Sequence, residues 1–222
     1  MEAKKALLVG ASGLVGSFVL DLLLKDSTYS EVRVLARRSL DLKSKNEKLQ
    51  EYILDFDNLK DLPPEIFQVD DVFSCLGNTS LRVENREQYL RIEIDYPVRL
   101  AELCAKQGAR SFHYVSAIGA SRKSKIKYSR MKGETEYKLK AIQAKNPSMS
   151  INSYRPSFIK GPRKQFRPVE LALLPVLDLL GCFMRGKFAV YRSIHAETIA
   201  KGMITRAKDF KPGFHLIDSD KI

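Results

Sequence analysis

The residues with the clearest chemical potential are Tyr128 and Lys132, in the segment Tyr128-Ser-Arg-Met-Lys132. If this segment is helical, the two side chains lie one turn apart on the same face. A phenol is a poor base at neutral pH, but a nearby ammonium group stabilises the phenolate and lowers the pKa of the phenol. Tyr128 can then exchange a proton with a carbonyl or alcohol oxygen, while Ser116 donates a hydrogen bond to that oxygen. The alternative is an ordinary exposed tyrosine and lysine on a helix surface.

A glycine-rich turn near the start of the chain is typical of dinucleotide binding. Its three glycines follow the strand-like run 5–9 and open the helical pattern 14–25. Glycines at this spacing allow a tight turn, a close approach of the backbone to a pyrophosphate, and close packing of the helix on the strand. The N-terminus of the helix adds free N–H groups. We therefore expect cofactor contacts at Gly10, Ser12, Gly13, Leu14, Val15 and Gly16, with a ligand-free turn as the alternative.

The second strand-like run, 32–36, ends without the acid that usually binds the ribose of NAD. Arg37 and Arg38 stand in its place. Because an arginine can pair bidentately with a 2′-phosphate, the sequence favours NADP(H), with a solvated basic turn as the alternative. Asp55 ends the third run, where its side chain can reach the adenine edge or cap the helix that follows.

Strand-like runs and helical patterns alternate along the chain. Strands are expected at 5–9, 32–36, 52–54, 71–76, 111–115 and 151–155, and helices at 14–25, at 86–106 with a kink near Pro97, and at 131–143. This alternation predicts an α/β fold with a doubly wound parallel sheet of the Rossmann type and helices on both faces. We interpret residues 1–222 as a single dinucleotide-binding domain with a small C-terminal substrate lobe at about 156–195.

The chain has 222 residues and a formal net charge of +12. Basic residues gather at 122–130, around Tyr128, and at 160–167, after the sixth strand. On this fold both segments border the same mouth, so they either attract an anionic small-molecule substrate or form a solvated rim beside the cofactor phosphates. Basic charge alone is weak support for nucleic-acid binding, which we do not expect.

The sequence indicates no metal centre, targeting signal or membrane span. Cys75, Cys104 and Cys182 are odd in number and lack C-x-x-C spacing. This favours free thiols in a reducing, cytoplasmic setting, with Cys75 and Cys104 buried. The three histidines lack ligand spacing. The longest apolar stretch, 171–184, is too short to span a bilayer. A lid helix is its favoured use, with a dimer surface or a membrane contact as alternatives.

Together these motifs resemble those of the atypical, extended-like short-chain dehydrogenase/reductases, and within that group the Tat-interacting oxidoreductase family and its bacterial relatives. The matching stretches span roughly residues 5–200 and are Gly10–Gly16, Ala36–Arg38, Cys75–Thr79, Arg91–Tyr96, Tyr128–Glu134 and Arg155-Pro156. The resemblance implies a Rossmann fold with NADPH at the carboxyl ends of the strands. It also implies a catalytic set of Ser116, Tyr128 and Lys132. The residues expected beside the cofactor are Lys132, Leu76, Gly77 and Pro156.

The activity that the resemblance implies is NADPH-dependent reduction, with hydride transfer to a carbonyl-type small molecule and Tyr128 as proton donor. Members of this branch are also proposed to act as NADPH-bound regulators, so an NADPH-sensing binding protein without turnover is the alternative. Two positions depart from the wider pattern. Asp95 stands where many relatives outside this branch carry an asparagine of a proton relay, and Ser157 replaces a common glycine.

Overall fold

The computed structural model describes residues 3–40, 46–77, 85–162 and 186–222. The apolar segment 171–184, Cys182 and most of the expected lobe at 156–195 lie outside these residues.

Within the described ranges, seven parallel strands form one sheet in the order β3-β2-β1-β4-β5-β6-β9. The strands are β1 (Lys4–Val9), β2 (Tyr29–Ala36), β3 (Leu49–Ile53), β4 (Asp71–Ser74), β5 (Ser111–Val115), β6 (Ser150–Arg155) and β9 (Gly213–Asp218). A separate parallel pair joins β7 (Ile159–Lys160) to β8 (Ile194–His195). The strand order reverses between β1 and β4, and ligands of such sheets bind beyond the carboxyl ends of the strands at that point.

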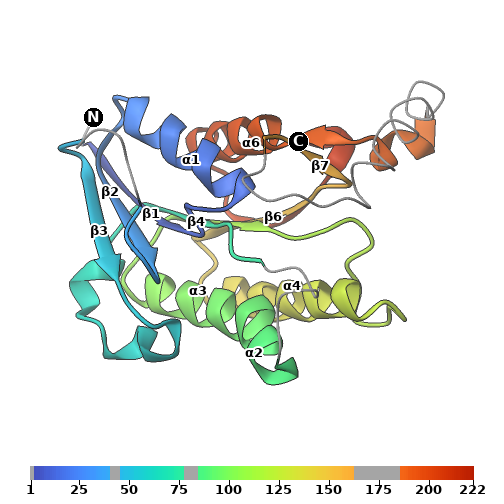
Figure 1. Ribbon diagram of the computed structural model, residues 1–222, viewed down its shortest axis with the longest axis horizontal. Coiled ribbons are helices and arrows are strands. Elements are labelled where there is room, and N and C mark those ends of the chain that lie inside the picture. The colour runs from blue at the N-terminus through green and yellow to red at the C-terminus, as the bar shows by residue number, and fades with distance from the viewer. Residues whose placement is uncertain (1–2, 41–45, 78–84, 163–185) are drawn as a thin grey trace.

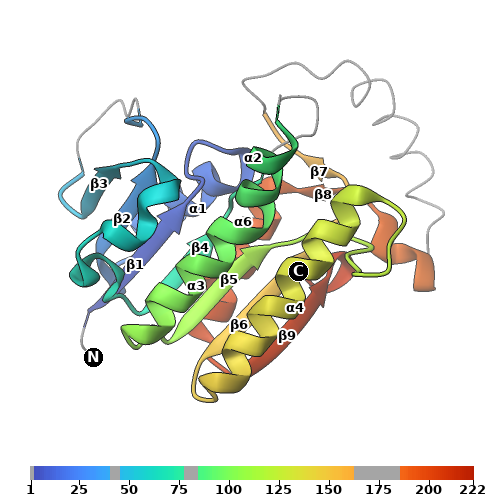
Figure 2. The ribbon, with the colours of Figure 1, turned by 90° about the horizontal axis from the view of Figure 1, so that it is seen from below.

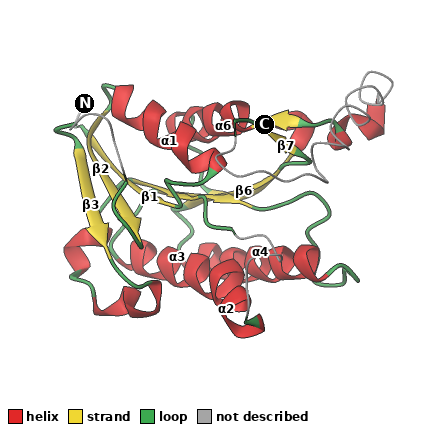
Figure 3. Ribbon diagram, viewed as in Figure 1, coloured by secondary structure: helices red, strands yellow, loops and turns green. Residues whose placement is uncertain are grey.

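Helices cover both faces of the sheet, so that the strands form the middle of three layers (Figures 1 and 3). The helices α1 (Leu14–Lys25) and α6 (Ala196–Lys208) pack together on one face. The opposite face carries α3 (Tyr96–Lys106) and α4 (Lys127–Lys145), which lie side by side in Figure 2, with α2 (Arg86–Leu90) preceding α3. Short 3-10 helices are η1 (Phe56–Asp61), η2 (Pro64–Phe67), η5 (Gly186–Tyr191) and η6 (Ser219–Lys221). This is the doubly wound α/β fold that the sequence predicts.

Strand β1 shows why the two cores form. Ala6 and Leu8 contribute to the core beneath α1 and α6, whereas Leu7 and Val9 contribute to the core beneath α3 and α4. Alternate residues of a strand point to opposite faces, so a strand buried on both faces is apolar throughout. The unbroken apolar run at the start of the chain is therefore the signature of a central strand.

Several elements begin earlier than the sequence predicts. Strand β2 begins at Tyr29, which is buried and pairs with Lys4, and α4 begins at Lys127, so that Tyr128 lies within the helix. The kink expected near Pro97 takes the form of a π-helical turn over Arg91–Asp95, immediately before α3. Proline lacks an N–H group and its ring clashes with the carbonyl four residues earlier, which here belongs to Glu93. The wide π turn accommodates that clash.

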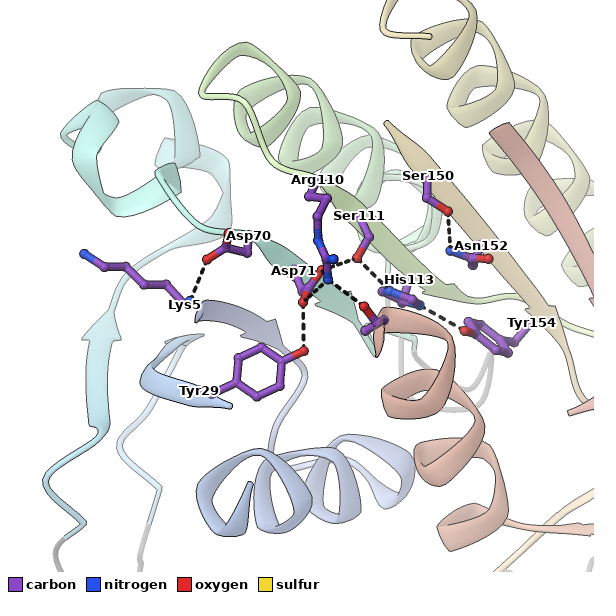
Figure 4. Close-up of polar contacts among 11 residues, drawn as sticks. Lys5, Tyr29, Asp70, Asp71, Arg110, Ser111, His113, Ser150, Asn152 and Tyr154 are labelled. Carbon is purple, nitrogen blue, oxygen red and sulfur yellow. Dashed lines mark hydrogen bonds and ion pairs between the residues drawn. The ribbon is translucent and has the colours of Figure 1, made fainter. Parts of the chain in front are cut away.

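A chain of buried polar side chains crosses the sheet on the side of α1 and α6 (Figure 4). Asp71 accepts hydrogen bonds from Tyr29 Oη at 2.8 Å and from Ser111 Oγ at 2.6 Å. His113 Nε2 lies 2.8 Å from Ser111 Oγ, and His113 Nδ1 lies 2.9 Å from Tyr154 Oη. Because Ser111 gives its only hydrogen to Asp71, His113 donates through Nε2 and accepts through Nδ1, as a neutral imidazole does.

Arg110 extends this network to the neighbouring helix. Its Nη2 lies 2.9 Å from Asp71 Oδ1 and donates to the carbonyl of Ala207, in α6, at 2.6 Å. Asp71 and Ser111 are the first residues of β4 and β5. The network therefore aligns the strands at their amino ends, opposite the edge where the predicted site residues lie.

We predict that acid destabilises the protein through His113. Burial, together with the positive charges of Arg110 and Arg206, lowers the pKa of this imidazole from 6.5 to about 3. Below about pH 6.5 the unfolded chain binds a proton at His113 that the folded chain does not, so the free energy of unfolding falls as the pH drops toward 3. In His113→Gln, about 2 kcal/mol of the decline between about pH 7.5 and pH 5 should disappear, as measured by urea unfolding.

The matched control is His195→Gln, at an exposed position, which should keep the wild-type dependence on pH. Identical pH dependence in the wild type and His113→Gln would contradict the prediction.

Candidate active site

The turn between β1 and α1 forms a tight backbone cradle. Gly10 has φ +81°, and a Cβ atom there would lie 2.5 Å from the carbonyl oxygen of Cys75. A Cβ atom at Gly16 would lie 2.1 Å from the carbonyl oxygen of Gly10. Gly13 caps α1 without a side-chain hydrogen bond, which leaves the first-turn N–H groups directed at the space beyond the helix. The cradle fits a dinucleotide pyrophosphate, with Ser12 exposed beside it.

The turn after β2 carries the two predicted phosphate-binding arginines. Arg37 and Arg38 are both exposed. A carboxylate, that of Glu51, approaches the same turn from β3, but it accepts hydrogen bonds from Ser39 Oγ at 2.9 Å and from the Leu40 N–H at 3.1 Å. The turn therefore presents positive charge to a ligand.

Asp55 caps a helix, which is one of the two roles open to it. Its Oδ1 accepts a hydrogen bond from the N–H of Asp57 at 3.1 Å, at the start of η1. No described contact bears on the alternative role at the adenine edge.

Lys132 is a fully buried cation in α4, with 1% of its surface exposed. Its Nζ lies 3.0 Å from Glu93 Oε2 and donates to the carbonyl of Val115, the last residue of β5, at 3.0 Å. It also lies 4.7 Å from the ring centroid of Tyr114 and 5.7 Å from that of Tyr128. Tyr128 is 38% exposed, so the predicted pair combines a buried ammonium with a phenol at the protein surface.

The charge on Lys132 is stabilised despite its burial. Burial alone would lower the pKa of the ammonium, but the negative charge of Glu93 raises it well above the usual value. Tyr89 packs nearby, and burial together with the charge of Glu93 raises the pKa of its phenol to about 12. Lys132 therefore carries its charge at neutral pH, and Tyr89 is protonated.

Ser116 belongs to a second buried group, centred on Glu136. The carboxylate of Glu136 accepts from Ser116 Oγ at 2.7 Å, from Ser153 Oγ at 2.9 Å and from Arg155 Nε at 2.9 Å. Arg155 Nη2 completes the ion pair at 2.5 Å. The hydroxyl hydrogen of Ser116 is thus directed at Glu136, and a substrate oxygen would compete with that carboxylate for it.

The remaining cofactor-side residues lie at the carboxyl ends of the same strands. Leu76 and Gly77 follow β4, and a Cβ atom at Gly77 would lie 3.7 Å from Glu93 Oε1 and 3.9 Å from Lys132 Nζ. Pro156 follows β6, and its carbonyl accepts from the N–H of Ile118 at 2.9 Å. The structure therefore brings the ends of β4 and β5 together around Lys132, while the end of β6 contacts the loop that follows β5.

Glu93 and Glu136 are the members of the site that sequence reasoning missed. Asp95 stands where relatives outside this branch carry the relay asparagine, and it is exposed. Glu93, in contrast, faces Lys132. Two spacings could have drawn attention to them: Glu136 lies four residues after Lys132, and Glu93 four residues before Pro97. Neither spacing reveals burial by itself.

Part of the predicted basic rim is engaged within the chain. Arg122 Nε lies 2.8 Å from Glu134 Oε2, and its guanidinium stacks 3.9 Å from the ring centroid of Tyr137. Lys123, Lys125, Lys127 and Arg130 are exposed. Among the described residues of this segment, these four side chains therefore carry the positive charge at the surface.

The wider expectations from composition have mixed outcomes. Cys75 and Cys104 are free thiols as predicted, but Cys75 is only half-buried, because it lies beyond the end of β4. Among the described residues there is no group of three or more His, Cys, Asp or Glu side chains that could hold a metal ion. None of the helices in those ranges is long and apolar enough to cross a membrane.

The chain belongs to the NAD dependent epimerase/dehydratase family, whose sequence profile matches residues 6–175. This places it among the extended short-chain dehydrogenase/reductases and confirms the resemblance stated from its motifs. Members of this class are NAD(P)-dependent.

Individual relatives agree with this assignment. Protein HTATIP2 of Rattus norvegicus is 31% identical over 172 residues, which are 77% of this chain and 69% of that protein. Protein fmp52-1, mitochondrial, of Aspergillus terreus is 33% identical over 182 residues, 78% of this chain and 75% of that protein. The solved structure of MoeE5 in complex with UDP-glucuronic acid and NAD has a TM-score of 0.72 at 18% identity, covering 96% of this chain and 75% of MoeE5. That likeness shows the shared fold.

We predict that Glu136 is required for stability as well as for the position of Ser116. Glu136→Gln leaves the partly buried Arg155 without its counter-charge, so the free energy of unfolding should fall by about 3 kcal/mol in urea denaturation. Glu134→Gln, on the same helix, breaks a surface pair with Arg122 and should cost less than about 1 kcal/mol. Equal losses in the two variants would show that the Glu136 pair is not the stronger one.

Proposed function

We propose that this protein is an NADPH-dependent reductase of a carbonyl-type small molecule. The observation that carries the proposal is the buried Lys132 ammonium, 5.7 Å from the ring centroid of Tyr128, at the carboxyl end of β5. The phosphate cradle lies at the carboxyl end of β1 in the same sheet. Membership of a class of NAD(P)-dependent oxidoreductases and epimerases supports this proposal.

The proposed chemistry divides between the cofactor and the chain. When bound, NADPH supplies the hydride that reduces the carbonyl carbon, and it is left as NADP+. Tyr128 gives its phenolic proton to the carbonyl oxygen, which becomes the hydroxyl of the alcohol product. In this proposal Lys132 also holds the nicotinamide ribose, and its charge stabilises the phenolate that remains after proton transfer. Ser116 orients the substrate oxygen in competition with Glu136.

The preference for NADP(H) over NAD(H) belongs to the same proposal. Arg37 and Arg38 are exposed at the end of β2, where the ribose of the adenosine half would lie. The nearby Glu51 carboxylate is already occupied by Ser39 and Leu40. Two arginines against one carboxylate leave the turn with a net positive charge, which a 2′-phosphate would balance.

We also infer the charge of the substrate and the cellular compartment in which the protein works. The exposed Lys123 and Lys125, close to Tyr128 in the chain, favour a small substrate that carries negative charge. The free thiols Cys75 and Cys104 favour a reducing compartment such as the cytoplasm. The names of the fungal relatives, by contrast, assign those proteins to mitochondria.

We predict that Tyr128→Phe abolishes turnover and spares cofactor binding. With a panel of aldehydes and ketones, NADPH oxidation should fall at least about 100-fold, because the proton donor is lost. NADPH affinity, measured by fluorescence titration, should change little. Tyr137→Phe removes an exposed hydroxyl from the same helix and should retain activity. Full activity in Tyr128→Phe would refute the mechanism, and tight NADPH binding without turnover of any carbonyl would favour an NADPH-sensing regulator.

The cofactor preference has a separate test. Wild-type protein should bind NADPH more tightly than NADH, and Arg37→Ala should weaken NADPH binding about tenfold by removing a charge-assisted hydrogen bond. NADH binding should be nearly unchanged. The matched control, Arg99→Ala, removes an exposed arginine from α3 and should leave both affinities as they are. Equal affinity of the wild type for the two cofactors would remove the argument from the arginines.

A further inference from the structure

Glu93 is a fully buried carboxylate beside the proposed proton donor, and the proton transfer described above does not itself require it. Its side chain lies 3.0 Å from Lys132 Nζ. Burying a carboxylate and an ammonium together is costly, and a buried pair adds stability only where its geometry and hydrogen bonds are good. A buried ion pair next to Tyr128 therefore calls for a functional explanation as well as a structural one.

Local structure dictates where Glu93 lies. Pro97 denies the Glu93 carbonyl its usual helical partner, and the chain forms a π turn at this point. The Glu93 carbonyl accepts a hydrogen bond from Thr135 Oγ1 at 2.8 Å. Thr135 and Lys132 are three residues apart on α4, so they share one face of that helix. Both the backbone and the side chain of Glu93 are thus fastened to the helix that carries Tyr128.

The ion pair between Glu93 and Lys132 also affects the protonation of the Tyr128 phenol. A lone ammonium beside Tyr128 would strongly favour the phenolate. With Glu93 Oε2 3.0 Å from Lys132 Nζ, the carboxylate offsets part of the effect of the ammonium on the phenol. The other titratable groups that face Lys132 are Tyr89, Tyr114 and Cys75, and burial raises the pKa of each of them, so none adds charge at neutral pH.

We propose that Glu93 is a positioning residue that holds Lys132 and offsets part of its charge, so that Tyr128 keeps its proton more firmly than it would beside a lone ammonium. This rests on the proposed reductase function for its purpose. It assigns a role to a residue outside the Ser116–Tyr128–Lys132 set.

The test follows the ionisation of Tyr128 directly, without a substrate. The full-length protein is labelled with 13Cζ-tyrosine, the Tyr128 signal is assigned by its loss in Tyr128→Phe, and its chemical shift is followed against pH. Removing the negative charge in Glu93→Gln leaves the ammonium unopposed, so the coupled Tyr128 and Lys132 pair should release its proton at a pH lower by about one unit or more. Glu102→Gln, an exposed carboxylate in α3, should leave the titration of Tyr128 unchanged.

A second variant covers the case in which Glu93→Gln does not fold. Glu93→Asp keeps the charge but withdraws the carboxylate by one methylene, so it should shift the titration of Tyr128 in the same direction by a smaller amount. An unchanged titration in whichever of these variants folds would overturn the role of Glu93. This measurement needs no turnover. A negative result would therefore reject the role of Glu93 without bearing on the reductase proposal, which is tested by NADPH oxidation and by Tyr128→Phe.

Discussion

Two buried ion pairs hold α4 against the sheet, and the arrangement of the candidate site depends on them. Lys132 pairs with Glu93 from the π turn before α3, and Glu136 pairs with Arg155 at the end of β6. These charges lie one helical turn apart on α4, and each would be costly to bury alone. Each pair therefore fixes the helix to a different neighbour, and together they fix the position of Tyr128 relative to the sheet.

A second buried polar network, centred on Asp71, aligns the strands at the opposite edge of the sheet. Asp71 is fully buried and is satisfied by Tyr29, Arg110 and Ser111, which come from different elements. A polar network of this kind stabilises one alignment of the strands because any slip would leave a buried charge unpaired. The strands are thus aligned at their amino ends by a network without any proposed catalytic role, whereas the glycine turn and Lys132 lie at their carboxyl ends.

The relatives and the site give complementary information. The family establishes the fold and a dependence on NAD(P), and its distant structural neighbours share that fold at 18% identity. The choice between cofactors, the direction of proton transfer and the substrate are properties of individual side chains. We propose that in this chain those side chains are the arginines after β2, the Glu93–Lys132 pair and the residues around Tyr128.

Local pattern was sufficient to predict six of the seven strands of the sheet, the glycine turn and the spacing of Tyr128 and Lys132, because each depends on residues close together in sequence. It did not predict β9, the strand at the edge of the sheet. Glu93 and Glu136 were not predictable in this way: in a helical segment a glutamate is usually exposed, and only packing against distant elements buries it. Pro97 predicted a distorted helix, but the tertiary structure decided that the Glu93 carbonyl would accept a hydrogen bond from Thr135 of α4. Short-range spacing thus determined the proposed reacting groups, and long-range packing decided the charges that surround them.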